Sequence, residues 1–176
     1  MSRSSIKQSK ASSSFGNTQV IRLALQAWGI DADKLIREAG IDFDYHQRTG
    51  KRVPFRSEDK LFRLILKKTD DPTIGIDLVQ FMNPTVYQAL GVALLCSSTL
   101  RNFCRRFERF FDVVSTLESA DFEQTEEGAF IVNRPRVEYS DATRGLHADA
   151  FCAVVVKFIR LVYRPDYHLK KLELCW

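Results

Sequence analysis

Three side chains in this sequence have the chemistry and the setting to bind a ligand: Tyr87, Arg144 and His147. His147 lies in the middle of a long apolar helical pattern, and Arg144 lies about one turn earlier near the same side. A polar pair at the mouth of an apolar pocket is what the binding of a small polar or acidic ligand requires. These residues therefore predict a ligand-binding site, to which Tyr87, in a separate apolar helix, is the weaker addition.

Each of the three residues also has an ordinary structural interpretation, which the sequence leaves open. A buried histidine often donates to a backbone carbonyl group, and an arginine often lays its apolar stem along the surface with its guanidinium group in water. A tyrosine within an apolar helix needs only one partner for its hydroxyl group. The choice between a ligand site and an ordinary core depends on whether a cavity opens beside His147.

Motifs for catalysis and for metal binding are absent from the sequence. It contains no Gly-rich phosphate loop, no serine nucleophile elbow and no HExxH zinc motif. The cysteines are scattered without a CxxC pair, and no histidine stands at zinc-ligand spacing; they are Cys96, Cys104, Cys152 and Cys175. We therefore expect reduced thiols and predict neither an enzyme, nor catalytic residues, nor a metal ion, nor a cofactor.

The composition is that of one globular domain. The chain has 176 residues, of which 45% are apolar and thirteen are phenylalanine, enough to bury a core of its own. No apolar run is long enough to cross a bilayer, and the first residues lack the layout of a secretory signal. We therefore expect a cytoplasmic protein that makes no contact with a membrane.

Residues 1–16 are rich in serine and lysine and offer almost nothing to bury. Such a segment is expected to remain a disordered, solvated tail. Three of the cations behind the net charge of +4, namely Arg3, Lys7 and Lys10, lie in this tail. Residues 17–176 are therefore nearly neutral, and we predict that they form a single domain whose charge gives no sign of DNA binding.

Capping residues divide the first two thirds of the chain into six helices. Asn17 and Asp31 are suited to begin the first two, and Gly29 and Gly40 to end them, each followed by an isoleucine that would complete a Schellman motif. A polar loop is expected at residues 44–52. The remaining helices are expected at residues 57–68, 71–82, 83–96 and 98–117.

The sixth of these helices carries four arginines in nine residues. Its apolar side chains follow the three-four spacing of a core-facing helix. Arg101, Arg105 and Arg109 lie on the opposite face, where Glu108 and Asp112 stand at spacings that allow ion pairs. The arginine stripe, as we call Arg101, Arg105 and Arg109, is therefore predicted to be a solvated face with internal ion pairs. A docking surface for another domain or a second subunit is the alternative.

The period of the apolar residues changes after this helix. Ala120, Phe122 and Gln124 alternate with polar positions, Glu127 and Gly128 supply a tight turn, and the alternation then resumes, which predicts a β-hairpin. A long helix is expected from Asp141, with an apolar arc so wide that the helix should be central and lie on the sheet.

Residues 168–176 alternate again and predict a C-terminal strand. The predicted fold is therefore α+β and mostly helical, with the hairpin and this strand forming a small antiparallel sheet against the long central helix. Because the chain stops on Trp176 in mid-strand, we interpret it as part of a longer protein; a native C-terminal edge strand is the alternative.

Several segments together resemble the N-terminal sensor domain of AraC/XylS-type bacterial transcription regulators, the so-called arabinose-binding type. The segments are "AWGIDADKLIREAGID", "RVPFRSEDKLFRLILKKTDDPTIGIDLVQF" and "YQALGVALLCSSTLRNFCRRFERFF". The best local match is "LGVALLCSSTL", in which Leu90, Gly91, Ser98, Thr99 and Leu100 stand where that branch has Leu-Gly and then Ser-x-Thr-Leu or a similar run. The likeness covers nearly all of residues 17–176 and depends on the order and spacing of the segments.

The resemblance implies a domain that senses a small-molecule effector and supports homodimer formation. It also implies that DNA is bound only by a C-terminal domain with two helix-turn-helix units, which is absent from these residues. The branch has diverse inducers, so no particular ligand is implied, and Tyr87, Arg144 and His147 are candidates from the sequence pattern alone. The alternative is a self-contained helical DNA-binding or adaptor protein that uses its first two helices and its basic tail.

Overall fold

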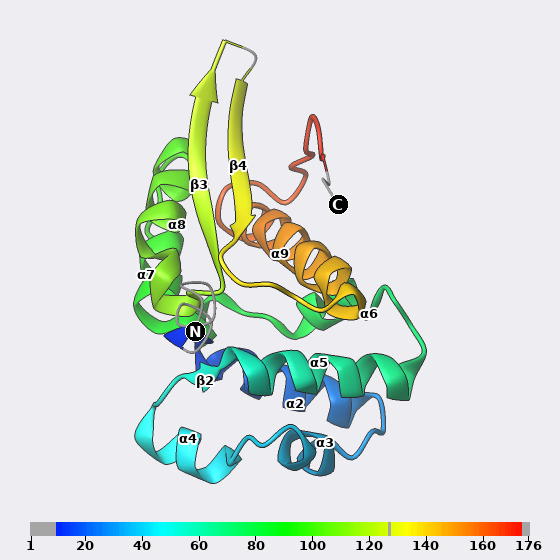
Figure 1. The fold of residues 1–176 in the computed structure, drawn as a ribbon. Helices are drawn as coiled ribbons and strands as arrows, with labels where there is room; N and C mark the ends of the chain where they lie inside the picture. Colours follow the sequence, from blue (N-terminus) through cyan, green and yellow to red (C-terminus); the bar gives the residue numbers. More distant parts are fainter. Residues whose placement is uncertain (1–9, 127, 174–176) are drawn as a thin grey trace.

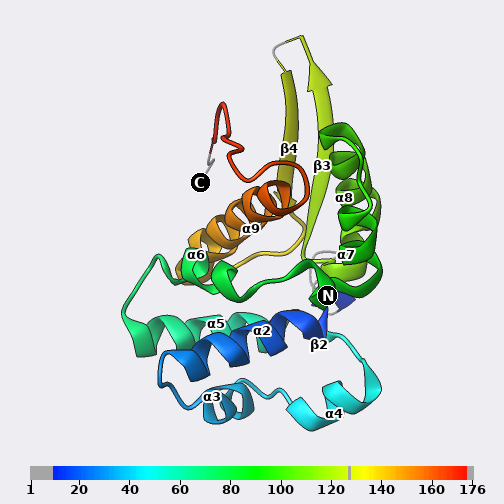
Figure 2. The ribbon, with the colours of Figure 1, turned by 180° about the vertical axis from the view of Figure 1, so that it is seen from behind.

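The computed structural model describes residues 10–126 and 128–173 and contains two layers (Figure 1). The lower layer consists of four helices, which are α2 (Phe15–Ala27), α3 (Ala32–Glu38), α4 (Phe43–Thr49) and α5 (Phe55–Thr69). In the upper layer a hairpin rises between two long helices, as Figures 1 and 2 show from opposite sides. These elements are β3 (Glu118–Thr125), β4 (Gly128–Pro135), α8 (Leu100–Val114) and α9 (Asp141–Val162).

Short helical segments connect the two layers. They are α6 (Ile74–Leu78), the 3₁₀ turns η1 (Val79–Phe81) and η2 (Pro84–Tyr87), and α7 (Gln88–Leu95). The predicted α+β class is confirmed, since helices dominate and the strands form two small antiparallel pairs. The hairpin is also confirmed: Thr125 pairs with Gly128 and Glu118 pairs with Pro135. The predicted turn residue Glu127 lies outside the described residues.

Local capping explains where the first helices end. Asp31 accepts a hydrogen bond from the backbone nitrogen of Lys34 at 3.0 Å, as an N-cap residue should. Gly29 and Gly40 take φ angles of 71° and 80°, in the left-handed region that favours glycine. The nitrogen of Ile30 donates to the oxygen of Leu25 at 2.9 Å, which completes the predicted Schellman motif.

The start of the chain differs from the prediction. Helix α2 begins at Phe15, where Ser14 rather than Asn17 is the N-cap residue. Strand β1 (Ser12–Ser13) pairs with strand β2 (Val53–Pro54), and Ser13 is fully buried. The predicted solvated tail is therefore wrong for residues 10–16, because backbone hydrogen bonds and the buried side chains of Ala11 and Phe15 hold this segment. Residues 1–9 lie outside the described part.

The predicted polar loop at residues 44–52 is also wrong over most of its length, where helix α4 forms. Asp42 accepts a hydrogen bond from the backbone nitrogen of Tyr45 at 2.9 Å, and Gly50 ends the helix with a φ angle of 64°. His46 turns inward, stacks on Phe15 at 5.8 Å between ring centroids, and is buried. One buried aromatic residue among polar neighbours is too weak a periodic signal to predict a helix from sequence.

The predicted C-terminal strand does not form in residues 168–173, and its last residues, 174–176, lie outside the described part. The segment lies near β4 in Figure 1, but none of the backbone hydrogen bonds of the described residues joins the two. Leu169 and Leu172 are 40% and 56% exposed. The alternation of residue types was correct for a strand, but a strand also needs a partner edge.

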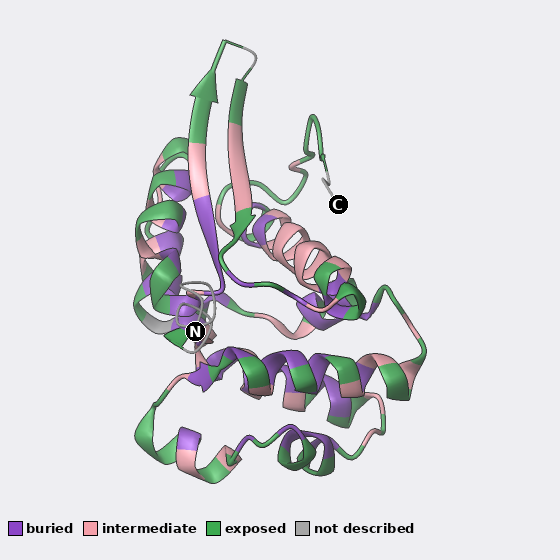
Figure 3. Ribbon diagram, in the orientation of Figure 1, coloured by how far each residue is buried: buried purple, intermediate pink, exposed green. Residues whose placement is uncertain are grey.

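Two large apolar clusters form most of the core (Figure 3). The first joins α2, α3 and α5, with Ile21 and Leu61 among its buried residues. The second joins α7, α8 and α9 to the base of the hairpin around Phe103 and Phe158, each at most 1% exposed. Within the described residues, no helix has the length and apolar character needed to cross a membrane.

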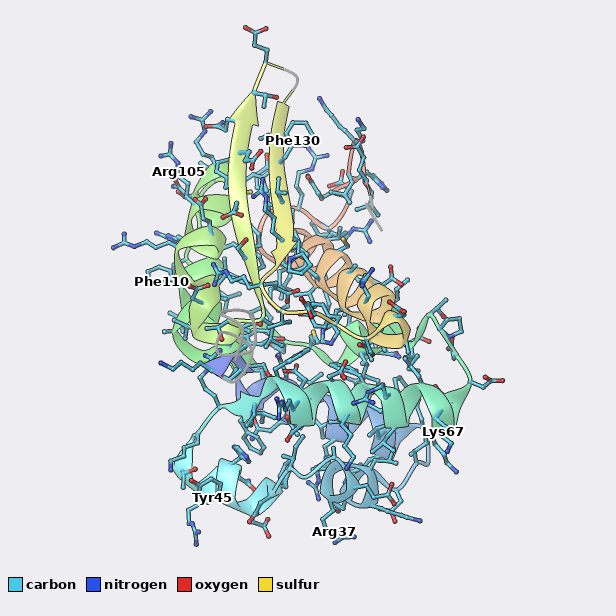
Figure 4. All side chains as sticks on the ribbon, in the orientation of Figure 1. Arg37, Tyr45, Lys67, Arg105, Phe110 and Phe130 are labelled. Carbon is cyan, nitrogen blue, oxygen red and sulfur yellow. The ribbon has the colours of Figure 1, made fainter. Side chains whose placement is uncertain are left out.

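The arginine stripe on α8 is exposed, as predicted, but its predicted ion pairs are wrong. Figure 4 shows Arg105 pointing away from the hairpin. Glu108 accepts a hydrogen bond from the backbone nitrogen of Phe122, and Asp112 pairs with Arg136 at 2.7 Å. No ion pair of the described residues includes Arg101, Arg105 or Arg109. Glu108 and Asp112 therefore bind partners in the hairpin and in the segment after it instead of the arginines of their own helix.

Because the stripe is solvated, we expect the double substitution Arg101→Glu with Arg105→Glu to change the free energy of unfolding by less than about 1 kcal/mol. Thermal unfolding followed by circular dichroism measures this. Arg106→Glu on the same helix is the contrast, since Arg106 donates to the carbonyl oxygen of Ala93 at 2.8 Å and should cost about 1–3 kcal/mol. Loss of the transition in the double variant would contradict the assigned face of α8.

Candidate functional site

A cleft of about 540 Å³ lies between the hairpin and α9. Its walls come mainly from the hairpin of β3 and β4, from one face of α9 and from the segment after α9, and the start of α8 and Tyr139 also line it. Its apolar and aromatic lining residues include Phe122, Phe130, Ile131, Phe151, Val155, Val156, Ile159 and Tyr167. A volume of this size and an apolar lining are typical of a pocket for a small organic molecule.

The wide apolar arc of α9 explains why a cleft forms here. The sequence predicted that this arc would lie on the sheet, whereas α9 packs mainly on α5, α6, η1 and α7, and the ring of Phe158 packs on Tyr87. Phe151, Cys152 and Val156 are only half-buried, because they face the cleft. The apolar surface of α9 is therefore larger than the neighbouring helices cover, and the hairpin lies across the cleft from it.

A polar group lies among these apolar walls. Glu118, at the start of β3, is 8% exposed and lines the cleft. The hydroxyl group of Tyr139 donates to its Oε2 at 3.4 Å. Burial raises the pKa of Glu118 to about 7, against the lowering effect of the Asn133 and Tyr139 side chains and of the charge of Arg136.

His147 lines the same wall as Glu118. Its ring packs against Tyr139 and Phe62, at 4.2 and 4.7 Å between ring centroids. Its Nε2 atom is buried and has no hydrogen-bond partner among the described residues. Burial lowers the pKa of His147 to about 4, although the charge of Asp59 acts in the opposite direction. The imidazole is therefore neutral at pH 7 and keeps one unused polar atom in the wall of the cleft.

A second, smaller cavity of about 80 Å³ lies behind the cleft. Glu118, His147 and Phe151 line both cavities and so form the wall between them. The inner cavity is also lined by Glu58, which is 4% exposed and whose Oε2 atom has no hydrogen-bond partner in the described part of the chain. Asn17, on the same lining, has a buried Oδ1 atom that is likewise unpaired there.

The three candidates from the sequence fall in two places. His147 and Arg144 both line the cleft, so the structure brings this pair together, as the helical spacing predicted. Arg144 lies at the rim, where its side chain is 49% exposed and contacts Asp141 at 3.5 Å. Tyr87 lines the inner cavity instead, packs against Phe158 and donates to the sulfur of Met82 at 3.5 Å. Burial raises the pKa of Tyr87.

Sequence reasoning missed the buried residues Glu118 and Tyr139 and the half-buried Asn133. A signal existed for Glu118, because the alternation that places Phe122 on the inner face of β3 places Glu118 on that face as well. A carboxyl group on the apolar face of a strand is a sign of a site. For Tyr139, in an irregular segment after β4, no periodic signal exists.

Charge is distributed unevenly over the cleft. The carboxyl group of Glu118 is buried in its wall, whereas the basic side chains Arg101, Arg144 and Lys171 are exposed around it. In the described part of the chain, no group of three or more His, Cys, Asp or Glu side chains is placed to hold a metal ion. Cys104 and Cys152 line the cleft as free thiols, and Cys175 lies outside the described residues.

The part of the chain that contains the cleft matches a known protein family. No curated protein matched the chain. Residues 29–175 match the family described as the arabinose-binding domain, at the N-terminus, of AraC transcription regulators. The match spans α3 to α9, and so it includes the hairpin and nearly every residue that lines the cleft. The chain therefore belongs to the family of N-terminal arabinose-binding domains of AraC transcription regulators.

Proposed function

We propose that this domain senses a small-molecule effector, which binds in the cleft between the hairpin and α9. The observation that carries the proposal is the combination of about 540 Å³ of apolar cleft with the buried Nε2 atom of His147 in its wall, which has no hydrogen-bond partner among the described residues. An ordinary core would be filled by side chains and would satisfy its polar atoms. The family membership supports a sensing function.

Two anchors make α9 the fixed side of the cleft. Thr143, at its start, donates to Asp59 of α5 at 2.6 Å, and both side chains are buried. Lys157, farther along, donates to the carbonyl oxygens of Val79 and Gln80 at 2.8 and 2.9 Å. The segment after α9 is held less firmly, since Arg160 provides one hydrogen bond to the oxygen of Tyr167 at 3.0 Å. The hairpin, in contrast, packs on α8, where Glu108 accepts a hydrogen bond from the nitrogen of Phe122. A ligand in the cleft would therefore shift residues 167–173 relative to α9.

We further propose that residues 17–176 act as one domain of a cytoplasmic regulator that forms homodimers and binds DNA through a separate helix-turn-helix domain. An effector that prefers one arrangement of residues 167–173 would change the population of states in which the DNA-binding domains are presented. We infer a regulatory role without catalysis, with the candidates Arg144 and His147 contacting the effector and Tyr87 supporting the inner wall.

The test is to fill the cleft. Val156 lines it and is half-buried, so Val156→Trp should place an indole ring in the space that the effector uses. Leu161→Trp is the matched control, because Leu161 lies on the same helix, is 58% exposed and does not line the cleft. We expect Val156→Trp to weaken binding of fragment-library hits at least about tenfold and the control to leave it unchanged.

Ligand-observed NMR with a library of small aromatic and aliphatic compounds provides the hits. Both tryptophan variants should unfold cooperatively, which circular dichroism checks. Hits that bind the Val156→Trp variant as well as the unchanged protein would place the binding site elsewhere, and the sensing function of the cleft would then be wrong.

A further inference from the structure

The buried carboxyl group of Glu118 has no cationic partner among the described residues. Its polar neighbours are neutral: the Tyr139 hydroxyl group donates to it at 3.4 Å, and the Asn133 side chain also favours its charged form. The cation that affects it, Arg136, pairs instead with Asp112 at 2.7 Å. Burying a carboxyl group without a positive partner is costly, so such groups are rare in an ordinary core.

The other charged side chains described near the cleft do not act as a cationic partner for Glu118. No ion pair of the described residues includes Glu118. The three basic side chains on the lining, Arg101, Arg144 and Lys171, are all exposed to solvent. His147, which packs on Tyr139, is neutral at pH 7 because burial lowers its pKa to about 4.

We propose, as an inference that rests on the proposed function, that the effector is an organic cation whose ammonium group contacts Glu118 and whose apolar body fills the cleft. The geometry supports each part of such a molecule. Phe122, Phe151 and Tyr139 bring aromatic rings to the same lining, and aromatic faces attract a cation. The acidic ligand that the sequence suggested would instead place its charge beside a buried carboxyl group.

The inner cavity strengthens this assignment. Glu58 lines it together with Glu118, is buried, and has no ion-pair partner among the described residues. Two carboxyl groups therefore share the wall behind the cleft, and the negative charge of one raises the pKa of the other. An ammonium group bound near this wall would supply the positive charge that both carboxyl groups lack.

The experiment compares three probes that share one apolar body: 3-phenylpropan-1-amine, 3-phenylpropan-1-ol and 3-phenylpropanoate. Isothermal titration calorimetry at pH 7 measures the dissociation constant of each. We expect the amine to bind at least about tenfold more tightly than the alcohol, and the carboxylate to bind least tightly, because a hydrogen bond to a charged group is stronger than a neutral one.

Glu118→Gln removes the charge and keeps the shape of the side chain, and it should erase the preference for the amine while leaving the binding of the alcohol unchanged. Glu123→Gln is the matched control, since Glu123 lies on the same strand, pairs with Arg134 and does not line the cleft. The control should retain the full preference of the unchanged protein.

A second measurement separates binding to Glu118 from a structural role. Burial raises the pKa of Glu118 to about 7, so at pH 6 the empty cleft holds mostly the protonated form. An ammonium group favours the carboxylate, so amine binding at pH 6 should release a proton. Titrations in two buffers with different ionisation enthalpies measure this release, which should be absent for the alcohol and in Glu118→Gln.

Each result of these titrations bears on a different claim. An alcohol or carboxylate that binds as tightly as the amine, or an amine preference that persists in Glu118→Gln, would overturn the inference while the cleft remains a ligand site. If none of the three probes bound at millimolar concentration, both the cation and the proposed sensing function of the cleft would be contradicted.

Discussion

Replacement of Gly91 by alanine should destabilise the protein by about 3 kcal/mol or more, the largest single-residue effect that we expect. A Cβ atom at this position would lie 1.7 Å from the carbonyl oxygen of Pro84 and 2.4 Å from its carbonyl carbon. Both are backbone atoms of the neighbouring turn η2, so no side-chain rotation relieves the clash. Helix α7 would have to move away from η2 and disturb Leu90 and Leu94, which are buried in the second core cluster.

Chemical denaturation and thermal unfolding measure the effect. For a chain of this size, a loss of about 3 kcal/mol corresponds to a decrease in Tm of roughly 6–12 °C. Two controls separate the clash from other effects of substitution. Val92→Ala, at a side chain that is 59% exposed on the same helix, should change stability by less than about 0.5 kcal/mol.

The second control introduces backbone strain without a clash. Gly29 has a φ angle of 71°, and no atom of the described residues lies within 4 Å of the place that a Cβ atom would take. Gly29→Ala should therefore cost only about 1–2 kcal/mol. If Gly91→Ala were no more costly than Gly29→Ala, the close contact between α7 and η2 would be wrong.

Glu58→Gln should stabilise the protein at pH 8 by about 1–3 kcal/mol and leave it unchanged at pH 4. Burial raises the pKa of Glu58 from 4.5 to about 7, an effect that the neighbouring Ser13 and Asn17 side chains only partly offset. Each pKa unit of difference between the folded and unfolded states corresponds to about 1.4 kcal/mol. The amide of glutamine carries no charge and has a nearby acceptor in the unpaired Oδ1 atom of Asn17.

The sign of this pH dependence follows from whether the folded or the unfolded state keeps the proton on Glu58. Below pH 4.5 Glu58 is protonated in both states, so burial of its charge costs nothing. As the pH rises from 4.5 to about 7, the unfolded chain loses the proton while the folded protein keeps it, and the free energy of unfolding falls. Above pH 7 the folded protein carries the buried charge and the penalty is constant.

His147 changes stability in the opposite sense, because burial lowers its pKa from 6.5 to about 4. Its contribution is lost as the pH falls from 6.5 to 4, since the unfolded chain takes up the proton first. Comparing Glu58→Gln with the unchanged protein at each pH isolates Glu58, because His147 is present in both. Urea denaturation at pH 4, 6 and 8 gives the three differences.

The matched control is Glu138→Gln, at an exposed position in the segment after β4. It should stay within about 0.5 kcal/mol of the unchanged protein at all three pH values. A Glu58→Gln variant that is less stable at pH 8 than the unchanged protein would show that the carboxylate is stabilised by partners in the inner cavity, contrary to the geometry described above.

Features that depend on neighbours within one or two turns could be predicted from the residues alone. Asp31 caps a helix, Gly29 ends one, and Arg144 shares a side of α9 with His147, because caps and helical periodicity are set by local backbone geometry. The hairpin follows from the alternation around Phe122 for the same reason. The family resemblance stated from segment order is confirmed by the match of residues 29–175.

Features that depend on which segments meet could not be predicted in this way. Helical spacing assigned Asp112 to the arginines of its own helix, whereas the fold brings Arg136 to it at 2.7 Å. Residues 168–173 have the alternation of a strand but find no partner edge, and Ser12–Ser13 form one because Val53–Pro54 lie beside them.

The candidate site likewise combines features that local spacing predicts with features that only the tertiary structure determines. The apolar arc of α9 and the position of His147 within it can be predicted from spacing alone. That the hairpin lies across a cleft from this arc, and that Glu118 is buried there beside Tyr139 without a cation, depends on contacts between residues far apart in the chain. The energy of a buried charge is set by everything that surrounds it, so only the folded arrangement could identify Glu118 as the centre of the candidate site.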